Sequence, residues 1–220
     1  MKCSTIRLLV LFTEMKILNL YAGIGGNRKL WEGHEITSIE NDPAIAFAYR
    51  QMFPTDNCII ADAHQYLLDH YKEYDFIWSS PPCPTHSVTN SFLNAQGVIR
   101  YPDMGLWQEI IFLKHFFKGK WVVENVKSYY EPIYKPTLID RHYFWSNFEI
   151  APLEVERNFN VARARASTRI SNEAYGKALE DFHDIHLPAN VKNARKLLRN
   201  AVYPPLGKHI LDCAKDNTLL

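Results

Sequence analysis

The sequence has few cysteines, almost no net charge, and no repeats or long hydrophobic runs. Its 220 residues include only four cysteines, which are widely scattered and lack the paired spacing of a zinc site and the density of a disulfide scaffold. The formal net charge of +1 gives no global argument for a polyanionic partner. The sequence contains no repeat, low-complexity segment or membrane-spanning run. With 47% hydrophobic residues, it predicts one globular domain, and the scattered cysteines favour a reducing, cytoplasmic setting.

The first fourteen residues differ in character from the rest of the chain. Residues 8–12 form a short apolar run after two basic residues, Lys2 and Arg7, which faintly resembles a signal peptide. The run is short, and no small-residue cleavage site comes after it. We therefore expect residues 1–14 to be a non-essential leader, with Met15 as an alternative start.

A glycine-rich turn follows the first predicted strand. The apolar residues 17–20 lead into the sequence Tyr-Ala-Gly-Ile-Gly-Gly-Asn at residues 21–27, and a helix is expected through residues 29–31. A strand, a glycine-rich turn and a helix let backbone N–H groups approach a nucleotide-like ligand. No third glycine completes the pattern that holds a pyrophosphate, so a cofactor without pyrophosphate fits better.

Acidic residues follow the next two predicted strands. Residues 35–39 lead to Glu40, which is placed to accept hydrogen bonds from both ribose hydroxyls of an adenosine cofactor. Pro43 is expected at the first position of the next helix. Residues 58–60 lead to Asp62, whose carboxylate either accepts from an adenine amino group or is solvated in a loop.

The sequence Trp-Ser-Ser-Pro-Pro-Cys-Pro-Thr-His-Ser at residues 78–87 displays one cysteine. A predicted buried strand over residues 74–78 runs into two prolines, which remove backbone donors and fix φ. This preset turn restricts the orientation of the Cys83 thiol. A free cysteine is more often a buried structural residue, but the groups that accompany Cys83 along the chain favour a nucleophile.

Further along the chain, a carboxyl group and a guanidinium group follow. The polar residues 88–104 are interpreted as a mobile lid, with disorder without function as the alternative, and a helix is predicted over residues 105–117. A predicted strand at residues 121–123 leads to Glu124, whose carboxyl group is costly to bury without a task or a partner. Arg141 precedes another predicted strand, residues 142–146, and so lies at the edge of the sheet.

In their order along the chain, these motifs resemble those of cytosine-5 DNA methyltransferases. The sequences concerned are Tyr-Ala-Gly-Ile-Gly-Gly, Glu-Asn-Asp-Pro, Pro-Pro-Cys with a serine four positions later, Glu-Asn-Val, and Leu-Arg-Asn-Ala-Val before Pro-Pro, spread over residues 15–211. The resemblance implies an α/β, Rossmann-like fold with a mostly parallel sheet flanked by helices and a small C-terminal recognition and closing segment. It also implies S-adenosylmethionine as methyl donor, S-adenosylhomocysteine as product and double-stranded DNA as partner, with no metal and no membrane.

The resemblance assigns roles to individual residues. It implies that Cys83 is the nucleophile, that Glu124 hydrogen-bonds the base and that Arg141 assists there. The cofactor-binding residues that it implies are Tyr21, Ala22, Gly23, Ile24, Gly25, Glu40, Asn41, Asp62, Ala63, Asn200 and Ala201. The nucleic-acid-binding residues expected are Ser87, Asn90, Arg163 and Arg165. Arg163 and Arg165 are also alternatives to Arg141 as the active-site arginine.

The chemistry explains why these residue types are required. Carbon 5 of cytosine is a poor nucleophile, so the ring must be activated by addition of the Cys83 thiolate to carbon 6. Negative charge then accumulates at N3, where Glu124 can hydrogen-bond and Arg141 adds a fixed positive charge. Because a duplex shields these atoms, the base must be flipped into the pocket, with residues 88–104 closing behind it.

The sequence also departs from the family pattern. Pro84 replaces the usual glutamine and Arg199 the usual glycine. Too few residues lie between residues 148 and 197 for the target-recognition domain of a typical restriction-linked member. Residues 157–199 hold nine Lys/Arg against four Asp/Glu, which indicates either a phosphate-binding surface or a solvated helical face. We expect recognition of one or a few bases, or help from a partner protein or a dimer.

The chain is expected to comprise four segments. These are a leader at residues 1–14, a catalytic and cofactor-binding domain at residues 15–148, a reduced target-recognition segment at residues 149–189, and C-terminal helices at residues 190–220 that return to the catalytic domain. Helices are predicted over residues 172–182, 190–198 and 206–214.

Two other functions stay open. A tRNA cytosine-5 methyltransferase uses the same cysteine chemistry. A catalytically silent nucleic-acid or cofactor-binding module would account for the short recognition segment, although it has no need of both Cys83 and Glu124. Amino-group methyltransferases place Asp or Asn before Pro-Pro, whereas this chain has Ser80 there, which argues against them.

Overall fold

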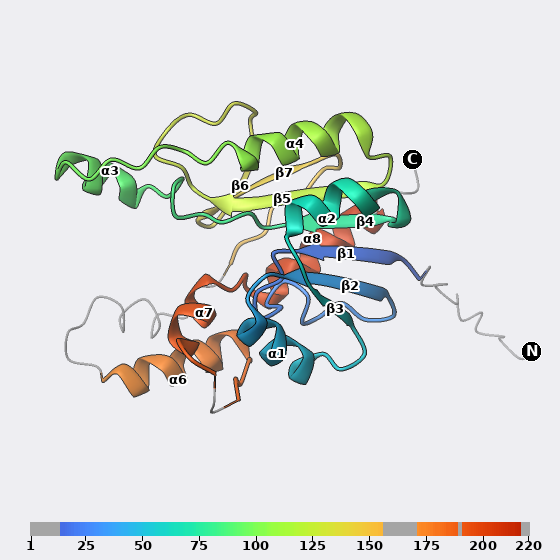
Figure 1. The fold of residues 1–220 in the computed structure, drawn as a ribbon, viewed down its shortest axis with the longest axis horizontal. Coiled ribbons are helices and arrows are strands. Elements are labelled where there is room, and N and C mark those ends of the chain that lie inside the picture. The colour runs from blue at the N-terminus through green and yellow to red at the C-terminus, as the bar shows by residue number, and fades with distance from the viewer. Residues whose placement is uncertain (1–13, 156–170, 189–190, 217–220) are drawn as a thin grey trace, which may run out of the picture.

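The computed structural model describes residues 14–155, 171–188 and 191–216. Within these residues, seven strands form one sheet in the order β3-β2-β1-β4-β5-β7-β6 (Figure 1). The neighbouring strands from β3 to β5 are parallel, and β7 runs antiparallel to both β5 and β6. The strands are β1 (Lys16–Leu20), β2 (Glu35–Glu40), β3 (Asn57–Ile60), β4 (Phe76–Ser79), β5 (Lys120–Val126), β6 (Thr137–Ile139) and β7 (His142–Ser146). The predicted α/β, Rossmann-like class is confirmed.

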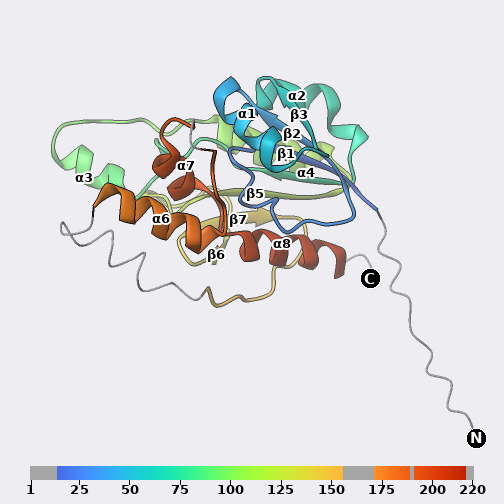
Figure 2. The same ribbon diagram turned by 90° about the horizontal axis from the view of Figure 1, so that it is seen from below.

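Helices cover both faces of the sheet. On one face, Leu67 of α2 (Ala63–His70) and Ile110 and Leu113 of α4 (Gly105–Phe116) pack against β1, β4 and β5. On the other face, α8 (Pro204–Asp216) packs Leu206 and Ile210 against β1, β4 and β7 (Figure 2). The other helical elements are α1 (Pro43–Met52), the 3-10 turn η1 (Tyr71–Glu73), α3 (Thr89–Ala95), α6 (Asn172–His183) and α7 (Ala194–Asn200).

The parallel register brings several loops to one edge of the sheet. Leu20, the last residue of β1, pairs with Ile39 on β2 and with Ser79 on β4. Ser79 pairs in turn with Val123 on β5, directly before Glu124. Ligands of open α/β sheets bind at the carboxyl ends of parallel strands. This edge is therefore where the predicted site should lie.

The helix expected through residues 29–31 is not formed. These residues make turns, in which backbone hydrogen bonds reach back only three positions. Arg28 donates to the carboxylate of Asp56, and the Trp31 indole N–H donates to the Gly207 carbonyl of α8 at 3.1 Å. These contacts with distant segments fix the backbone in turns and override the local helical preference.

The polar stretch at residues 88–104 contains a short helix, α3, that the sequence analysis did not expect. Figure 1 shows α3 projecting to the far left, away from the sheet. Phe92, Ile99 and Tyr101 in this stretch are 75%, 63% and 81% exposed. The role of the segment as a lid stays a prediction.

The three predicted C-terminal helices correspond to α6, α7 and α8. Pro204 and Pro205 begin α8, as a first helical turn tolerates proline. Helix α7 begins at Ala194, later than predicted, because Asn193 adopts a left-handed conformation with φ of 57°. No helix in the described ranges has the length and hydrophobicity needed to cross a membrane.

Candidate active site

In the glycine-rich loop after β1, residues with positive φ alternate with apolar residues that anchor the loop. Tyr21, Gly23 and Gly25 have positive φ values of 55°, 54° and 71°. Between them, Ala22 and Ile24 are buried, so their side chains anchor the loop in the core. A Cβ added to Gly25 would lie 2.4 Å from an aromatic ring next to α1, whereas a Cβ on Gly23 would meet nothing within 4 Å. The loop is therefore closely packed at Gly25 and open beside Gly23.

Glu40 joins this loop to the end of β2. Its Oε2 accepts a hydrogen bond from the N–H of Gly23 at 2.9 Å, and its Oε1 accepts one from the N–H of Asp42 at 2.9 Å. Because each carboxylate oxygen has two lone pairs, Glu40 retains acceptor capacity at both oxygens. The neighbouring Asn41 is exposed.

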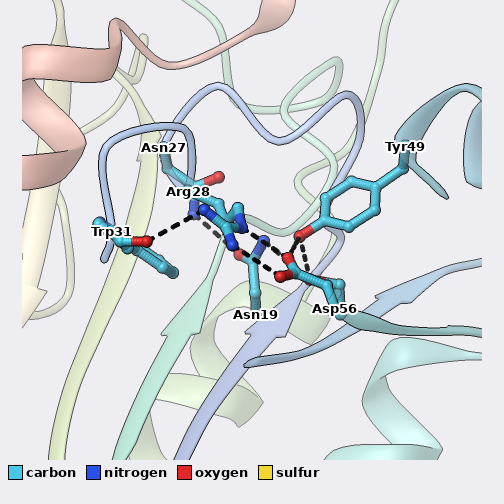
Figure 3. A network of polar contacts seen from close by, with 7 residues as sticks. Asn19, Asn27, Arg28, Trp31, Tyr49 and Asp56 are labelled. Atoms are coloured by element: carbon cyan, nitrogen blue, oxygen red, sulfur yellow. Dashed lines mark hydrogen bonds and ion pairs between the residues drawn. The ribbon is translucent and has the colours of Figure 1, made fainter. Parts of the chain in front are cut away.

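A network of polar side chains supports the loop (Figure 3). Arg28 donates to both carboxylate oxygens of Asp56, at 2.5 and 2.7 Å, and the Tyr49 hydroxyl donates to Asp56 at 2.6 Å. Asn27 donates to Asn19 on β1 at 2.8 Å. Ser38 on β2 connects the two halves, at 3.4 Å from the Asn19 amide and 2.6 Å from the Tyr49 hydroxyl. Because Asn27 and Arg28 are adjacent, the network forms a ring that fixes the loop to two strands and α1.

A second buried cluster centres on Glu109 of α4. Its Oε1 accepts from the Tyr21 hydroxyl at 2.5 Å and lies 3.2 Å from Nδ1 of His64, and its Oε2 accepts from the Ser79 hydroxyl at 2.5 Å. Burial and the charge of Glu109 raise the pKa of Tyr21 well above its usual range. The hydrogen bond to Glu109 raises the pKa of His64. The cluster ties the glycine-rich loop to the end of β4.

The sequence analysis missed Glu109, because it treated the apolar stripe of α4 as core packing. The available signal was an acidic residue on that stripe, between Leu106 and Ile110 at helical spacing. Glu109 is only 1% exposed, and a buried carboxylate requires hydrogen-bond donors. Those donors come from other elements, so the sequence alone does not identify them.

Asp62 has a structural role at the start of α2. Its Oδ1 accepts a hydrogen bond from the backbone N–H of Gln65 at 2.8 Å, which caps the helix. Ala63, the first helical residue, is buried. The other carboxylate oxygen of Asp62 takes no hydrogen bond from any described residue, so it is available to a ligand.

The segment that carries Cys83 is held on both sides. Asn125 on β5 donates to the carbonyl of Pro81 at 3.0 Å, and Asn90 on α3 donates to the carbonyl of Pro84 at 2.7 Å. The carbonyl of Cys83 itself accepts from the backbone N–H groups three and four positions later, at 3.0 and 3.2 Å. These contacts fix the backbone around the thiol, which is itself partly exposed.

The thiol of Cys83 shares its surroundings with Glu124 and Arg141. Burial raises the pKa of the thiol, the charge of Glu124 raises it further, and Arg141 acts in the opposite direction. The thiol is therefore protonated at neutral pH in this state. Glu124 lies within β5, opposite Phe144 on β7, rather than beyond the end of a strand, because β5 extends to Val126.

Arg141 lies in the turn between β6 and β7 and is exposed. Its Nη2 donates to the carbonyl of Arg199 at the end of α7, at 3.3 Å. The next residue, His142, places Nε2 3.8 Å from Oε1 of Glu124, and burial lowers its pKa. A neutral histidine therefore lies beside Glu124 at neutral pH. The sequence analysis placed His142 only at the start of a predicted strand and gave it no role in the site, although it directly follows Arg141.

Of the two predicted cofactor residues near the C-terminus, Ala201 lies against the glycine-rich loop. Asn200 ends α7 and Ala201 follows it. A Cβ added to Gly26 would lie 3.0 Å from the Cβ of Ala201 and 2.4 Å from the carbonyl oxygen of Val202. Only a glycine permits this contact, which brings two distant parts of the chain together.

The four residues expected to contact nucleic acid have different surroundings. The hydroxyl of Ser87 accepts a hydrogen bond from Thr89 at 3.0 Å. Asn90 is completely buried, so in this conformation its side chain supports the Cys83 segment and cannot reach a nucleic acid. Arg163 and Arg165 lie outside the described residues. Across the described ranges, no three potential metal-ligating side chains are grouped as a metal site requires.

The chain was compared with protein families and with solved structures. The sequence model of one family, described as C-5 cytosine-specific DNA methylase, matches residues 15–138. No curated protein matches the chain. Among solved structures, the chain is similar to the Entamoeba histolytica methyltransferase EhMeth, with a TM-score of 0.59 and 11% identity over 93% of this chain and 99% of that one. It is also similar to a mutant of Spodoptera frugiperda DNMT2, with a TM-score of 0.59 and 16% identity over 90% and 99%. At these identities the structural similarity shows the fold alone.

Proposed function

Because the chain belongs to the C-5 cytosine-specific DNA methylase family, we propose that it transfers a methyl group from S-adenosylmethionine to carbon 5 of cytosine in double-stranded DNA. The observation that carries this proposal is that the Cys83 segment lies beside Glu124: β4, which leads into it, pairs with β5 up to Val123, and Asn125, the residue after Glu124, donates to the Pro81 carbonyl at 3.0 Å. A thiol and a carboxyl group are of the types that nucleophilic activation of cytosine needs.

The residues at the carboxyl ends of β1, β2 and β3 fit S-adenosylmethionine. Glu40 has acceptor capacity for two ribose hydroxyls, and the space beside Gly23 is open to a ligand. Asp62 has one carboxylate oxygen available for an amino group. When bound, S-adenosylmethionine supplies an electrophilic methyl group on a sulfonium. Ala201 packs against Gly26 of the same loop, and Asn200 directly precedes it.

Cys83 acts as the nucleophile in this proposal. Its thiol first loses a proton, and the thiolate adds to carbon 6 of cytosine, which makes carbon 5 nucleophilic. After carbon 5 is methylated, it loses its proton, the carbon–sulfur bond breaks and Cys83 leaves as thiolate. The hydrogen bonds around Pro81 and Pro84 hold the backbone of the nucleophile in one place through both steps.

Glu124 and Arg141 stabilise the charge that the attack creates. Addition of the thiolate drives negative charge to N3 of the ring, where Glu124 in its protonated form donates a hydrogen bond. Arg141 contributes a fixed positive charge, and its hydrogen bond to the Arg199 carbonyl limits where that charge lies. The neutral His142 beside Glu124 adds no positive charge of its own to the site.

The base has to leave the duplex to reach this site. Glu124 is buried and Cys83 is only partly exposed, at the carboxyl ends of the parallel strands, so a stacked base cannot reach them. Residues 88–104 project from the body directly after the nucleophile segment (Figure 1). We assign to this segment the closure behind a flipped base.

A covalent-trapping experiment tests the proposal. Duplex DNA that carries 5-fluorocytosine is incubated with the protein and S-adenosylmethionine, and the products are separated on a denaturing gel. The fluorine cannot leave as a proton does, so the Cys83 adduct accumulates after methyl transfer. We expect a shifted protein–DNA band with the wild type but not with Cys83→Ser. Cys58→Ser is the control and should also give the band, because the Cys58 sulfur is buried beside α1.

The same experiment distinguishes the two alternatives. A band with fluorinated transfer RNA and none with DNA would identify an RNA methyltransferase. Absence of a band with either nucleic acid, while S-adenosylmethionine still binds, would identify a silent module. Binding of S-adenosylmethionine is measured by calorimetry, and Glu40→Ala serves as the variant expected to lose it.

A further inference from the structure

Three segments at the carboxyl edge of the sheet meet at Glu109 of α4. Its carboxylate accepts hydrogen bonds from Tyr21, directly after β1, and from Ser79, the last residue of β4, both at 2.5 Å. Nδ1 of His64, which lies in the first turn of α2 after β3, is 3.2 Å from the same carboxylate. Glu109 is only 1% exposed. One buried carboxylate therefore joins side chains from three different loops or strand ends.

Tyr21 has a backbone conformation that needs support from its surroundings. Its φ of 55° lies in the left-handed region, which costs free energy for a residue with a Cβ. Two bonds hold the following backbone, because the Ala22 N–H donates to a carbonyl of β2 and the Gly23 N–H to Glu40, each at 2.9 Å. The bond to Glu109 holds the polar end of the Tyr21 side chain. It adds to the contacts that keep the start of the glycine-rich loop left-handed.

The charged groups around the Tyr21 hydroxyl keep it a hydrogen-bond donor. Burial raises the pKa of Tyr21 far above its usual range. The negative charges of Glu109, Asp62 and Asp103 raise this pKa further, so the phenol stays protonated. His64 faces the same carboxylate from α2, and the hydrogen bond between them raises the pKa of His64. Because a hydrogen bond to an ionised acceptor is stronger than one between neutral groups, the Tyr21 hydroxyl is held firmly in one direction.

Core packing by itself would favour an apolar residue in place of Glu109. Leu106, Ile110 and Leu113 of the same helix are apolar and buried in the core under α4. A carboxylate among them costs free energy unless its donors are in place. A satisfied buried polar network, however, specifies one arrangement of the groups that form it. The groups that Glu109 joins belong to the candidate site, so the arrangement that it specifies is that of the site.

We propose that Glu109 is a positioning residue for the cofactor, which keeps the glycine-rich loop in its ligand-binding conformation through Tyr21 and holds the start of the Cys83 segment through Ser79. The inference rests on the proposed function, because it takes S-adenosylmethionine as the ligand of the loop. Ser79 stands four positions before Cys83. The methyl donor and the nucleophile must reach the same ring. A carboxylate that holds both segments sets their relative position.

The expected size of the effect follows from the population of the binding conformation. A ligand that binds one conformation of a loop has its affinity reduced by the fraction of molecules in that conformation. Without the hydroxyl of Tyr21, the start of the loop is free to leave the left-handed region. If the binding conformation falls to about one tenth of the molecules, S-adenosylmethionine binds about tenfold more weakly.

Calorimetric titration with S-adenosylmethionine tests the link through Tyr21. We expect Tyr21→Phe to bind about fivefold to tenfold more weakly than the wild type. The double variant of Tyr21→Phe with Glu109→Ala should bind as Glu109→Ala alone does, because the hydroxyl acts through that carboxylate. Circular dichroism shows that each variant is folded. Tyr21→Phe carries the test if Glu109→Ala is not.

Tyr74→Phe is the matched control for the titration. Its hydroxyl also has a side-chain partner, the hydroxyl of Tyr66 at 3.1 Å. Tyr74 precedes β4, at the end of the strand away from Cys83. This variant should bind S-adenosylmethionine as the wild type does.

The rate of Cys83 alkylation by iodoacetamide, without S-adenosylmethionine, tests the link through Ser79. Ser79→Ala removes one donor to Glu109, so the Cys83 segment is held less firmly and its thiol should react about threefold faster. The modified residue is identified by mass spectrometry. Ser146→Ala is the control, because its hydroxyl donates to the Phe148 carbonyl at the opposite edge of the sheet. This control should leave the rate unchanged.

The outcomes separate this inference from the proposed function. A wild type that binds S-adenosylmethionine no more tightly than Tyr21→Phe overturns the positioning role and leaves the proposed function standing. Losses that add in the double variant overturn it as well, because Tyr21 would then act independently of Glu109. An unchanged alkylation rate in Ser79→Ala overturns the link to the Cys83 segment. A wild type that does not bind S-adenosylmethionine overturns both the inference and the proposed function.

Discussion

Replacing Gly207 by alanine tests the contact between α8 and the glycine-rich loop. A Cβ at Gly207 would lie 2.2 Å from the carbonyl oxygen of Asn27 and 2.6 Å from its Cα. Both atoms belong to the backbone, so no side-chain rotation relieves the overlap. The helix and the loop would have to separate by about 1 Å, which forfeits much of the dispersion energy across their interface.

Whether Gly207→Ala stabilises or destabilises the protein depends on two opposing contributions to the free energy of unfolding. Alanine in a helix interior is favoured over glycine by about 1 kcal/mol. Overpacking of a close contact costs about 1–3 kcal/mol, and α8 carries Leu206 and Ile210 of the core, so a shift of the helix disturbs their packing as well. We expect the cost to exceed the gain and Gly207→Ala to destabilise the protein by about 1–2 kcal/mol.

Urea unfolding, followed by far-ultraviolet circular dichroism, measures this difference. Gly176→Ala in α6 is the matched control, because its Cβ would meet only a flexible arginine side chain at 3.7 Å, an ordinary contact. That variant is expected to gain about 0.5–1 kcal/mol from helix propensity. If Gly207→Ala is as stable as Gly176→Ala, α8 does not pack on the loop as described.

Three further predictions concern single side chains. Glu124→Gln is expected to lower the pKa of Cys83, because it removes a negative charge that raises it; the pH midpoint of Cys83 alkylation, followed by mass spectrometry, should fall, and an unchanged midpoint would place the two groups apart. Glu109→Ala is expected to lower the free energy of unfolding in urea by about 2–4 kcal/mol, since the buried Ser79 hydroxyl and the half-buried Tyr21 hydroxyl lose their acceptor, and Glu109→Gln by less. Equal losses would contradict the cluster. Burial lowers the pKa of His183 to about 4, so the unfolded state binds a proton first as the pH falls. Stability should then decrease below about pH 6.5, by about 2 kcal/mol at pH 5, and His183→Gln should flatten this dependence.

Local signals predicted much of the sheet and its edge. Apolar runs that end in turn residues located β1, β2, β4 and β7, and Pro43 marked the start of α1. Glu40 was identified because an acidic residue after the second strand is well placed for a ribose. Its two backbone hydrogen bonds, to Gly23 and Asp42, were not predictable, because they depend on how two loops meet.

Contacts between distant residues account for what the sequence did not reveal. The turns at residues 29–31 are fixed by Asp56 and by α8, neither of which is near in sequence. Asn90 was expected to contact nucleic acid, but its side chain is buried and donates to the Pro84 carbonyl. Glu109 receives its donors from three other elements. In each case the partner that determines the conformation is distant in sequence and is brought close only by the tertiary fold. No local motif therefore indicates it.

Transfer of labelled methyl groups tests the central claim most directly. S-adenosylmethionine with a labelled methyl group is incubated with duplex DNA and, in parallel, with transfer RNA, using the wild type, Cys83→Ser and Cys58→Ser. The account predicts label in DNA, at carbon 5 of cytosine by bisulfite sequencing, with the wild type and Cys58→Ser and none with Cys83→Ser. Label that appears only in RNA, or that persists in DNA with Cys83→Ser, would contradict it.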